Sequence, residues 1–220
     1  MMKKINVLVA DDHTLFRKGM VNILNESNDI QVVAEAAHGF EVLKQVSNGI
    51  HIDVILMDLN MPQLDGIETM KRLASRGITI PVVMVSMEYN ELRVIHLIRL
   101  GARGYVLKEA DPDEVKDAIR AVFRSGFFFN SVVNMQFIEQ MNSRKLDEGP
   151  PAQKLTEREL EFLTLVCTEL NYKQIADKMG VSSRTVDGYR DDLFTKLNLK
   201  SRVGLAVYAV KNGLVPKTND

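Results

Sequence analysis

The sequence predicts a doubly wound α/β domain with a five-stranded parallel sheet, followed by a small all-α domain that contains a helix-turn-helix. Three observations support this. In residues 1–127, five short runs rich in β-branched residues alternate with longer segments of helical periodicity. A polar segment ending in Pro150-Pro151 then separates them from a region with helical patterns only. The length of 220 residues suits two such units.

The first domain is expected to contain the strands Ile5–Ala10, Gln31–Glu35, Val54–Met57, Pro81–Val85 and Gly104–Val106. Each strand is followed by a segment whose apolar residues recur at three- and four-residue spacings. These segments predict helices over Leu15–Leu24, Gly39–Val46, Gly66–Leu73, Glu91–Leu100 and Pro112–Phe123. An alternation of this kind predicts parallel strands joined by crossover helices.

Residues 128–152 are expected to form a linker, with one helix over Ser131–Met141 before the Pro-Pro pair. Residues 153–216 follow as the helical domain. Thr156 and Glu159 predict a capping box for a helix that runs to about Leu170. Further helices are expected over Tyr172–Met179, Ser183–Leu197 and Arg202–Asn212, with Ser182 as a cap, Gly180 in the turn, and Val186 packed on Ile175.

Composition narrows the class of protein. Residues 1–151 are acidic and residues 152–220 are mildly basic, which favours different partners for the two halves. The one cysteine, Cys167, lies in an apolar helical run and excludes a disulfide within the chain. No stretch approaches the ~18 apolar residues of a membrane span. We expect a soluble cytoplasmic protein with no membrane partner.

Charged and polar residues follow the expected strands of the first domain. Asp11-Asp12 comes after the first strand, Asp58 after the third, Ser86 after the fourth and Lys108 after the fifth. Because parallel strands bring these ends to one edge of the sheet, the groups should gather near the point where strand order reverses. Carboxylates suit Mg²⁺, with Asp12 and Asp58 as ligands and Asp11 acting through water. Asp58 is the natural nucleophile for a phosphoryl group, with Lys108 and the Ser86 hydroxyl on its oxygens.

These residues resemble a known family. Asp11-Asp12-His13, Asp58-Leu59-Asn60-Met61-Pro62, Ser86, and Tyr105 with Lys108 are similar to the flavodoxin-like receiver domain of bacterial two-component response regulators. Leu155–Glu159 and the segment from Ile175 to Leu197 resemble the LuxR-type output domain, so the chain resembles the NarL/FixJ subfamily.

The resemblance implies roles for individual residues. It implies phosphorylation of Asp58 by a histidine kinase, and a Mg²⁺ site formed by Asp12, Asp58 and the Asn60 carbonyl. Lys108 would hold the phosphoryl group. Ser86 and Tyr105 would form the switch, with the Ser86 hydroxyl drawn to the phosphoryl group and Tyr105 filling the vacated space. The surface of the fourth and fifth helices would then change, which would either pair two receivers in a homodimer or release the output domain from them.

The helical domain is expected to bind two half-sites of double-stranded DNA as a dimer, with Val203, Val207 and Val210 available for the dimer contact. Candidate contacts to phosphates or bases are Lys173, Ser183, Arg184, Thr185, Tyr189, Arg190, Lys196 and Lys200. The acids Asp187 and Asp191-Asp192 oppose phosphate binding by a monomer. Asp187 also has the chemistry to accept a hydrogen bond from cytosine N4.

Two alternatives stay open. A Mg²⁺-dependent phosphohydrolase uses the same aspartyl-phosphate chemistry, but it would normally carry an acid two residues beyond the nucleophile, where this chain has Asn60. A phosphorylation-gated protein-binding module would explain the acids of the second domain, and salt-dependent DNA binding would exclude it. The sequence favours a regulator that is not a turnover enzyme.

Overall fold

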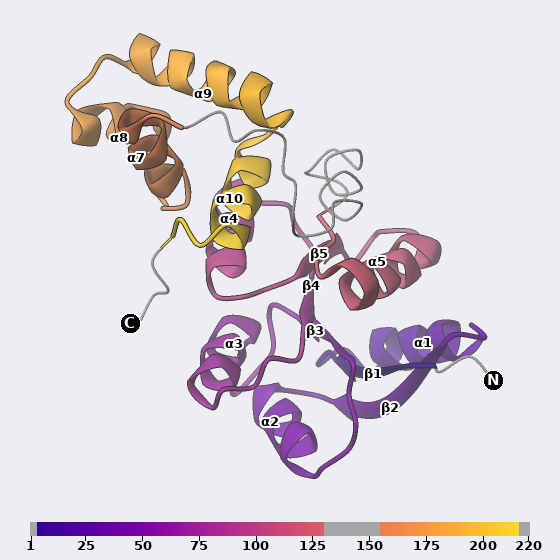
Figure 1. Cartoon of the computed structure of the whole chain (residues 1–220). Helices are drawn as coiled ribbons and strands as arrows, with labels where there is room; N and C mark the ends of the chain where they lie inside the picture. The colour runs from indigo at the N-terminus through magenta and orange to yellow at the C-terminus, as the bar shows by residue number, and fades with distance from the viewer. Residues whose placement is uncertain (1–3, 130–154, 216–220) are drawn as a thin grey trace. The chain divides into compact units, whose positions relative to one another are not determined.

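The computed structural model describes residues 4–129 and 155–215 of the chain (Figure 1). By their contacts these residues form two compact units, which are described separately. The first unit contains residues up to Tyr89 together with Leu100–Phe129, and the second contains Asn90–Arg99 together with the described residues from 155 onward.

The first unit is built on a parallel sheet. Its strands are β1 (Ile5–Ala10), β2 (Ile30–Ala36), β3 (Val54–Asp58), β4 (Val82–Ser86) and β5 (Gly104–Leu107). They lie in the order β2-β1-β3-β4-β5, and every neighbouring pair is parallel. The predicted fold class is therefore confirmed. β4 begins one residue later than expected, although the Pro81 carbonyl still accepts the Ile55 amide at 3.0 Å.

The sheet is buried because its strands are almost continuously apolar. Every residue of β3 and β4 is buried, including the polar ends Asp58 and Ser86. Burial on both faces is typical of parallel sheets covered by crossover helices. Within the sheet, β2 lies on one side of β1 and β3 lies on the other, so the strand order reverses at β1. The carboxyl ends of β1 and β3 therefore lie beside each other.

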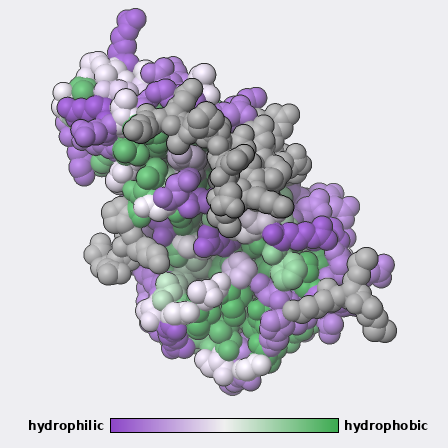
Figure 2. Space-filling view, in the orientation of Figure 1, coloured by the Kyte–Doolittle hydropathy of each residue, from purple (hydrophilic) through white to green (hydrophobic). Residues whose placement is uncertain are grey.

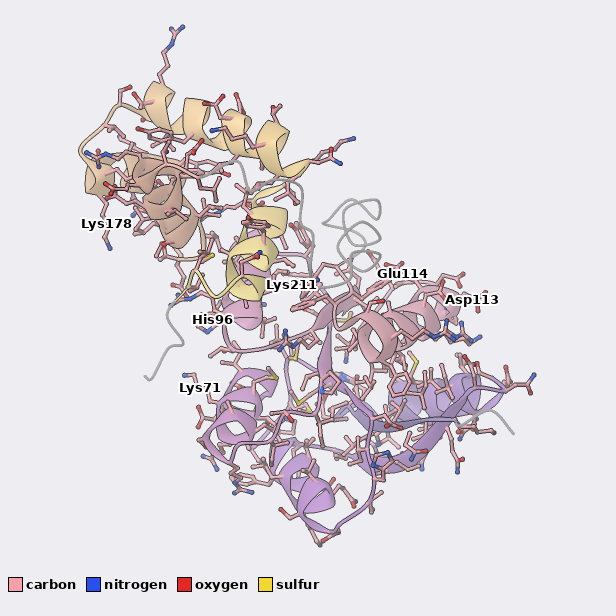
Figure 3. All side chains as sticks on the ribbon, viewed as in Figure 1. Lys71, His96, Asp113, Glu114, Lys178 and Lys211 are labelled. Carbon is pink, nitrogen blue, oxygen red and sulfur yellow. The ribbon has the colours of Figure 1, made fainter. Side chains whose placement is uncertain are left out.

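Helices cover the two faces of this sheet. α1 (Thr14–Asn25) and α5 (Pro112–Ser125) lie on one face, and α2 (Gly39–Ser47) and α3 (Gly66–Ser75) lie on the other (Figure 1). The start of α5 carries Asp113 and Glu114 at its exposed end (Figure 3), where negative charge complements the helix dipole. α5 ends at Gly126, which adopts a left-handed cap with φ 84°.

The first unit continues past the expected boundary at residue 127. Phe128 donates its amide to the Arg103 carbonyl at 2.8 Å, and its own carbonyl accepts the Tyr105 amide at 3.1 Å. Phe128 and Phe129 are both nearly fully buried. These two residues therefore extend the core of the first unit. The expected helix over Ser131–Met141 lies outside the described residues.

The second unit is helical. It comprises α4 (Glu91–Arg99), α7 (Glu157–Val166), α8 (Tyr172–Met179), α9 (Ser183–Leu197) and α10 (Arg202–Lys211), and α10 packs against α4 and α7. The Thr156–Glu159 capping box is present, and Ser182 caps α9, as predicted. Gly180 turns the chain between α8 and α9 with φ 65°, which completes the predicted helix-turn-helix.

α7 ends at Val166, earlier than the predicted end near Leu170. The reason is the guanidinium of Arg202, which is nearly fully buried. It donates to the carbonyls of Val166, Thr168 and Leu170 at 2.7–3.1 Å. Carbonyls that would otherwise need a further helical turn are satisfied by this side chain, so the chain can leave the helix.

The outer surface of α7–α9 is mostly hydrophilic in the space-filling view (Figure 2). No helix in the described parts of the chain is long and apolar enough to cross a membrane. In the first unit, two large apolar side chains are strongly exposed: Leu15 has an exposed fraction of 88% and Met87 one of 67%.

Candidate functional site

Two carboxylates occupy adjacent strand ends. Asp11 follows β1 and Asp58 ends β3, and each is only 2% exposed. The two strands are paired in register through Ala10 and Met57, so the following residues lie side by side. Two acids buried at one point require a cation between them or a shared proton. Their position is the one that the sequence predicted.

Lys108 supplies a cation to both acids. Its Nζ lies 2.7 Å from Asp11 Oδ2 and 2.7 Å from Asp58 Oδ2, and its side chain is 7% exposed. Its amide donates to the Ser86 carbonyl at 2.7 Å, which ties the end of β5 to β4. The other Asp58 oxygen, Oδ1, accepts the Asn60 amide at 3.3 Å. The structure thus brings Asp11, Asp58, Lys108 and the Asn60 backbone together.

Burial and charge act in opposite directions on these groups. Burial raises the pKa of the Asp58 carboxyl above its usual range, Lys108 opposes the rise, and the Asp11 charge adds to it. Burial alone would lower the pKa of the Lys108 ammonium, but hydrogen bonds to Asp11 and Asp58 outweigh it, so that pKa is raised. Lys108 is therefore a permanent cation at neutral pH.

The site also fits a divalent cation. Ligand atoms of Asp11, Asp12, His13 and Asp58 all lie within 4.8 Å of one another. Asp11 Oδ2 and Asp12 Oδ1 are buried, with Lys108 Nζ at 2.7 Å from the first and His13 Nδ1 at 3.0 Å from the second. Carboxylate oxygens gathered in this way are ligands of the kind that a hard cation prefers.

Sequence reasoning assigned no individual role to three residues that shape the site. His13 places Nδ1 3.0 Å from Asp12 Oδ1. Arg17 donates to the Asp11 carbonyl and pairs with Glu35, at 3.2 Å between Nε and Oε2. Gly66 leaves room for the Asp58 carbonyl, which a Cβ would meet at 2.7 Å. The adjacency of His13 to the acidic pair and the glycine after Asp65 were the available signals.

The expected switch residues Ser86 and Tyr105 are close to each other, and Tyr105 is buried. It is 1% exposed, and its hydroxyl donates to the Glu88 carbonyl at 2.5 Å. The Ser86 hydroxyl donates to the same carbonyl at 3.2 Å. The two expected switch residues therefore share the Glu88 carbonyl as acceptor.

The second unit divides the expected DNA contacts into two sets. The residues that are exposed and make no ion pair within the described parts of the chain are Lys173, Ser183, Arg184, Thr185 and Lys200. Asp187 is also exposed, although it pairs with Arg190, which in turn pairs with Asp191 of the same helix. Lys196 pairs with Glu159, a residue only 3% exposed, and Tyr189 is partly buried with its ring 6.2 Å from that of Phe162. Lys196, Tyr189 and Arg190 are therefore committed to contacts within the unit.

The expected dimer contact on α10 is not supported by the burial of its residues. Val203 and Val207 are 0% and 2% exposed within the single chain. Only Val210 is partly exposed. Val203 and Val207 are therefore core residues of the second unit in this arrangement. The nearly buried Cys167 is also a core residue, and burial raises the pKa of its thiol to about 12, which makes it unreactive.

Comparison with known proteins identifies both units. A family model of the response regulator receiver domain matches residues 7–120, and one of bacterial regulatory proteins of the luxR family matches residues 153–209. The chain is 35% identical to the oxygen regulatory protein NreC of Staphylococcus aureus (strain bovine RF122 / ET3-1) over 217 residues, which cover 96% of this chain and 99% of NreC.

Two solved structures are also similar. A LuxR-family two-component response regulator from Aurantimonas sp. SI85-9A1 is 27% identical, with a TM-score of 0.53 over 57% of this chain and 88% of that chain. The RcsB response regulator in complex with DNA is 22% identical, with a TM-score of 0.54 over 94% and 98%, and shares the fold. The chain therefore belongs to the response regulators of two-component systems, and it combines a receiver domain with a LuxR-type DNA-binding domain.

Proposed function

We propose that this chain is a cytoplasmic transcription regulator that a sensor histidine kinase activates by phosphorylating Asp58, and that the phosphorylated form binds two DNA half-sites as a homodimer. The observation that supports this most directly is the burial of Asp58 at a strand end with Lys108 at 2.7 Å. A carboxylate held in place beside a fixed cation can attack phosphorus with little rearrangement.

The chemistry requires a phosphoryl donor on the kinase. An Asp58 oxygen forms a bond to the phosphorus of a phosphohistidine, the N–P bond breaks, and the leaving imidazole keeps the electron pair. Lys108 lies where it can stabilise negative charge on the oxygens of the transferred phosphoryl group. The backbone N–H of Asn60 donates to the second carboxylate oxygen of Asp58. A Mg²⁺ ion held by Asp12, Asp58 and the Asn60 carbonyl would neutralise phosphoryl oxygens, with Asp11 acting through water.

The product is a stored signal. An acid at position 60 would be placed to activate water against the acyl phosphate, but Asn60 is exposed and carries an amide. We therefore infer slow self-dephosphorylation and no turnover of a substrate, which separates this chain from a phosphohydrolase. The Ser86 hydroxyl, at the end of β4, is the group that would turn from the Glu88 carbonyl toward the phosphoryl group.

The test is binding of the full-length protein to a random duplex library, with and without acetyl phosphate and Mg²⁺. Asp58→Ala is the control, and phosphorylation itself is followed by intact mass. Phosphorylation-dependent enrichment of a sequence with two half-sites, lost in Asp58→Ala, is the expected result. If Asp58 takes up a phosphoryl group but neither state enriches a sequence, DNA binding is refuted and a protein-binding output is favoured.

A further inference from the structure

The outer face of α9 carries an unusual set of groups for a helix that contacts DNA. Val186 and Leu193 point inward and are fully buried. The exposed residues one and two turns apart on the other side are Arg184, Asp187, Gly188 and Asp191. Only Arg184 among these four is a cation, and it makes no ion pair with the described residues.

Arg190 is paired with two acids of this helix. Its Nη1 lies 3.0 Å from Asp187 Oδ1, and its Nε donates to Asp191 Oδ1 at 2.9 Å. Asp191 in particular raises the pKa of the Arg190 guanidinium. The guanidinium carbon lies 5.6 Å from the centre of the Tyr172 ring, which stacks on the buried ring of Phe162. Arg190 is therefore anchored to the core of the unit.

This anchoring orients Asp187. One carboxylate oxygen, Oδ1, is occupied by Arg190, which leaves Oδ2 to accept a hydrogen bond from outside the protein. The side chain is 52% exposed and lies in the first half of α9, the part of a recognition helix that normally contacts base edges. A carboxylate placed there is repelled by phosphates and needs a donor on a base.

We propose that Asp187 is a specificity-determining residue that accepts a hydrogen bond from cytosine N4, and that Arg190 is the residue that positions it. This inference rests on the proposed DNA-binding function. In the major groove only cytosine N4 and adenine N6 carry exocyclic donors. Adenine also presents the acceptor N7 beside its amino group, which repels a carboxylate, whereas the neighbouring edge of cytosine is a C–H group.

Gly188 provides the space that such a contact requires. A glycine in the exposed interior of a helix weakens that helix relative to alanine. No packing explains it, because a Cβ built at Gly188 meets nothing within 4 Å. The backbone next to Asp187 is thus open to close approach by a base edge.

The experiment compares sequences selected from a random duplex library by the phosphorylated full-length wild type and by Asp187→Ala, Asp187→Asn and Arg190→Met. Wild type is expected to prefer cytosine at one position of each half-site by roughly 5- to 150-fold. Asp187→Ala should lose this preference at that position alone. Asp187→Asn should shift it toward adenine, because an amide can donate to N7 and accept from N6. Arg190→Met should weaken it.

Asp192→Asn is the matched control, since it removes an exposed acid of the same helix that makes no ion pair with the described residues. It should leave the selected sequence unchanged. Circular dichroism of each variant establishes that α9 is folded. The inference is overturned if Asp187→Ala strengthens binding to all sequences and retains the cytosine. Failure of the wild type to enrich any sequence would instead refute the proposed function.

Discussion

Lys196 and Lys200 are both candidate DNA contacts by sequence, but the structure gives them different environments. Lys196 pairs with Glu159, whose side chain is 4% exposed, and Lys200 is exposed. We predict that Lys196→Gln destabilises the second unit and that Lys200→Gln does not. Breaking a fully buried pair costs about 3–5 kcal/mol. Because the Lys196 side chain is 33% exposed, water replaces part of the lost interaction, and we expect a loss of about 1–2 kcal/mol.

The pH dependence of this stabilisation follows from the pKa of the Glu159 carboxyl. Burial alone would raise the pKa of Glu159, but hydrogen bonds from Lys196 and Thr156 outweigh it, so its pKa lies below the usual 4.5. As pH falls, Glu159 is protonated at a higher pH in the unfolded chain than in the folded chain. The stabilisation is therefore fully present above about pH 4.5 and is lost as pH falls through the folded pKa. Wild type and Lys196→Gln should converge in stability at low pH.

The assay is thermal unfolding of the full-length variants, together with the salt dependence of DNA binding. A loss of about 1–2 kcal/mol in a domain of this size lowers the melting temperature by roughly 4–16 °C. Lys200→Gln should keep the wild-type melting temperature and reduce the slope of log K against log salt by about 0.9 if it contacts one phosphate. Equal melting of Lys196→Gln and wild type at pH 7 would refute a stabilising role for the Lys196–Glu159 pair.

Three further substitutions and one control test the architecture. In a denaturant titration, Gly66→Ala should lower the free energy of unfolding by about 1–3 kcal/mol, because its Cβ would meet the Asp58 carbonyl at 2.7 Å. The same variant should slow phosphorylation of Asp58. The control Gly19→Ala, which has open space around it, should be neutral or stabilising in the same titration. Arg202→Met should lower the free energy of unfolding of the second unit by about 3 kcal/mol, because three carbonyls lose a charged donor. An unchanged melting temperature would contradict the role of Arg202 in ending α7. Tyr105→Phe should cost about 1 kcal/mol and shift the NMR resonance of the Glu88 carbonyl carbon, because it removes the hydrogen bond to that carbonyl and keeps the ring. An unshifted resonance would count against the hydrogen bond from Tyr105.

The strands and the acidic site could be predicted because their signals are local. A run such as Val54–Met57 is apolar throughout, and the position of Asp58 after it places a carboxylate at a known edge of a parallel sheet. Topology alone then brings Asp11, Asp58 and Lys108 together. The same logic located the capping box and the turn at Gly180, since each depends on residues only a few positions apart.

The choice of partner for a long side chain could not be predicted in this way. Glu159 and Lys196 are 37 residues apart, and Arg202 contacts Val166 across 36 residues. Such pairs depend on how the helices pack. The sequence therefore does not distinguish a lysine that forms an ion pair from one that does not. The end of α7 was misjudged for this reason, because the donor that terminates it comes from α10.

The proposed switch residues Ser86 and Tyr105 both donate to the carbonyl of Glu88. The Glu88 carbonyl has two lone pairs and accepts from Tyr105 at 2.5 Å and from Ser86 at 3.2 Å. A phosphoryl group on Asp58 would offer Ser86 a charged acceptor, which forms a stronger hydrogen bond than a neutral carbonyl. The longer of the two bonds would therefore be lost and the shorter retained. On the proposed mechanism, phosphorylation would release one of these two hydrogen bonds to the segment between β4 and α4, and the Tyr105 ring would stay in the core.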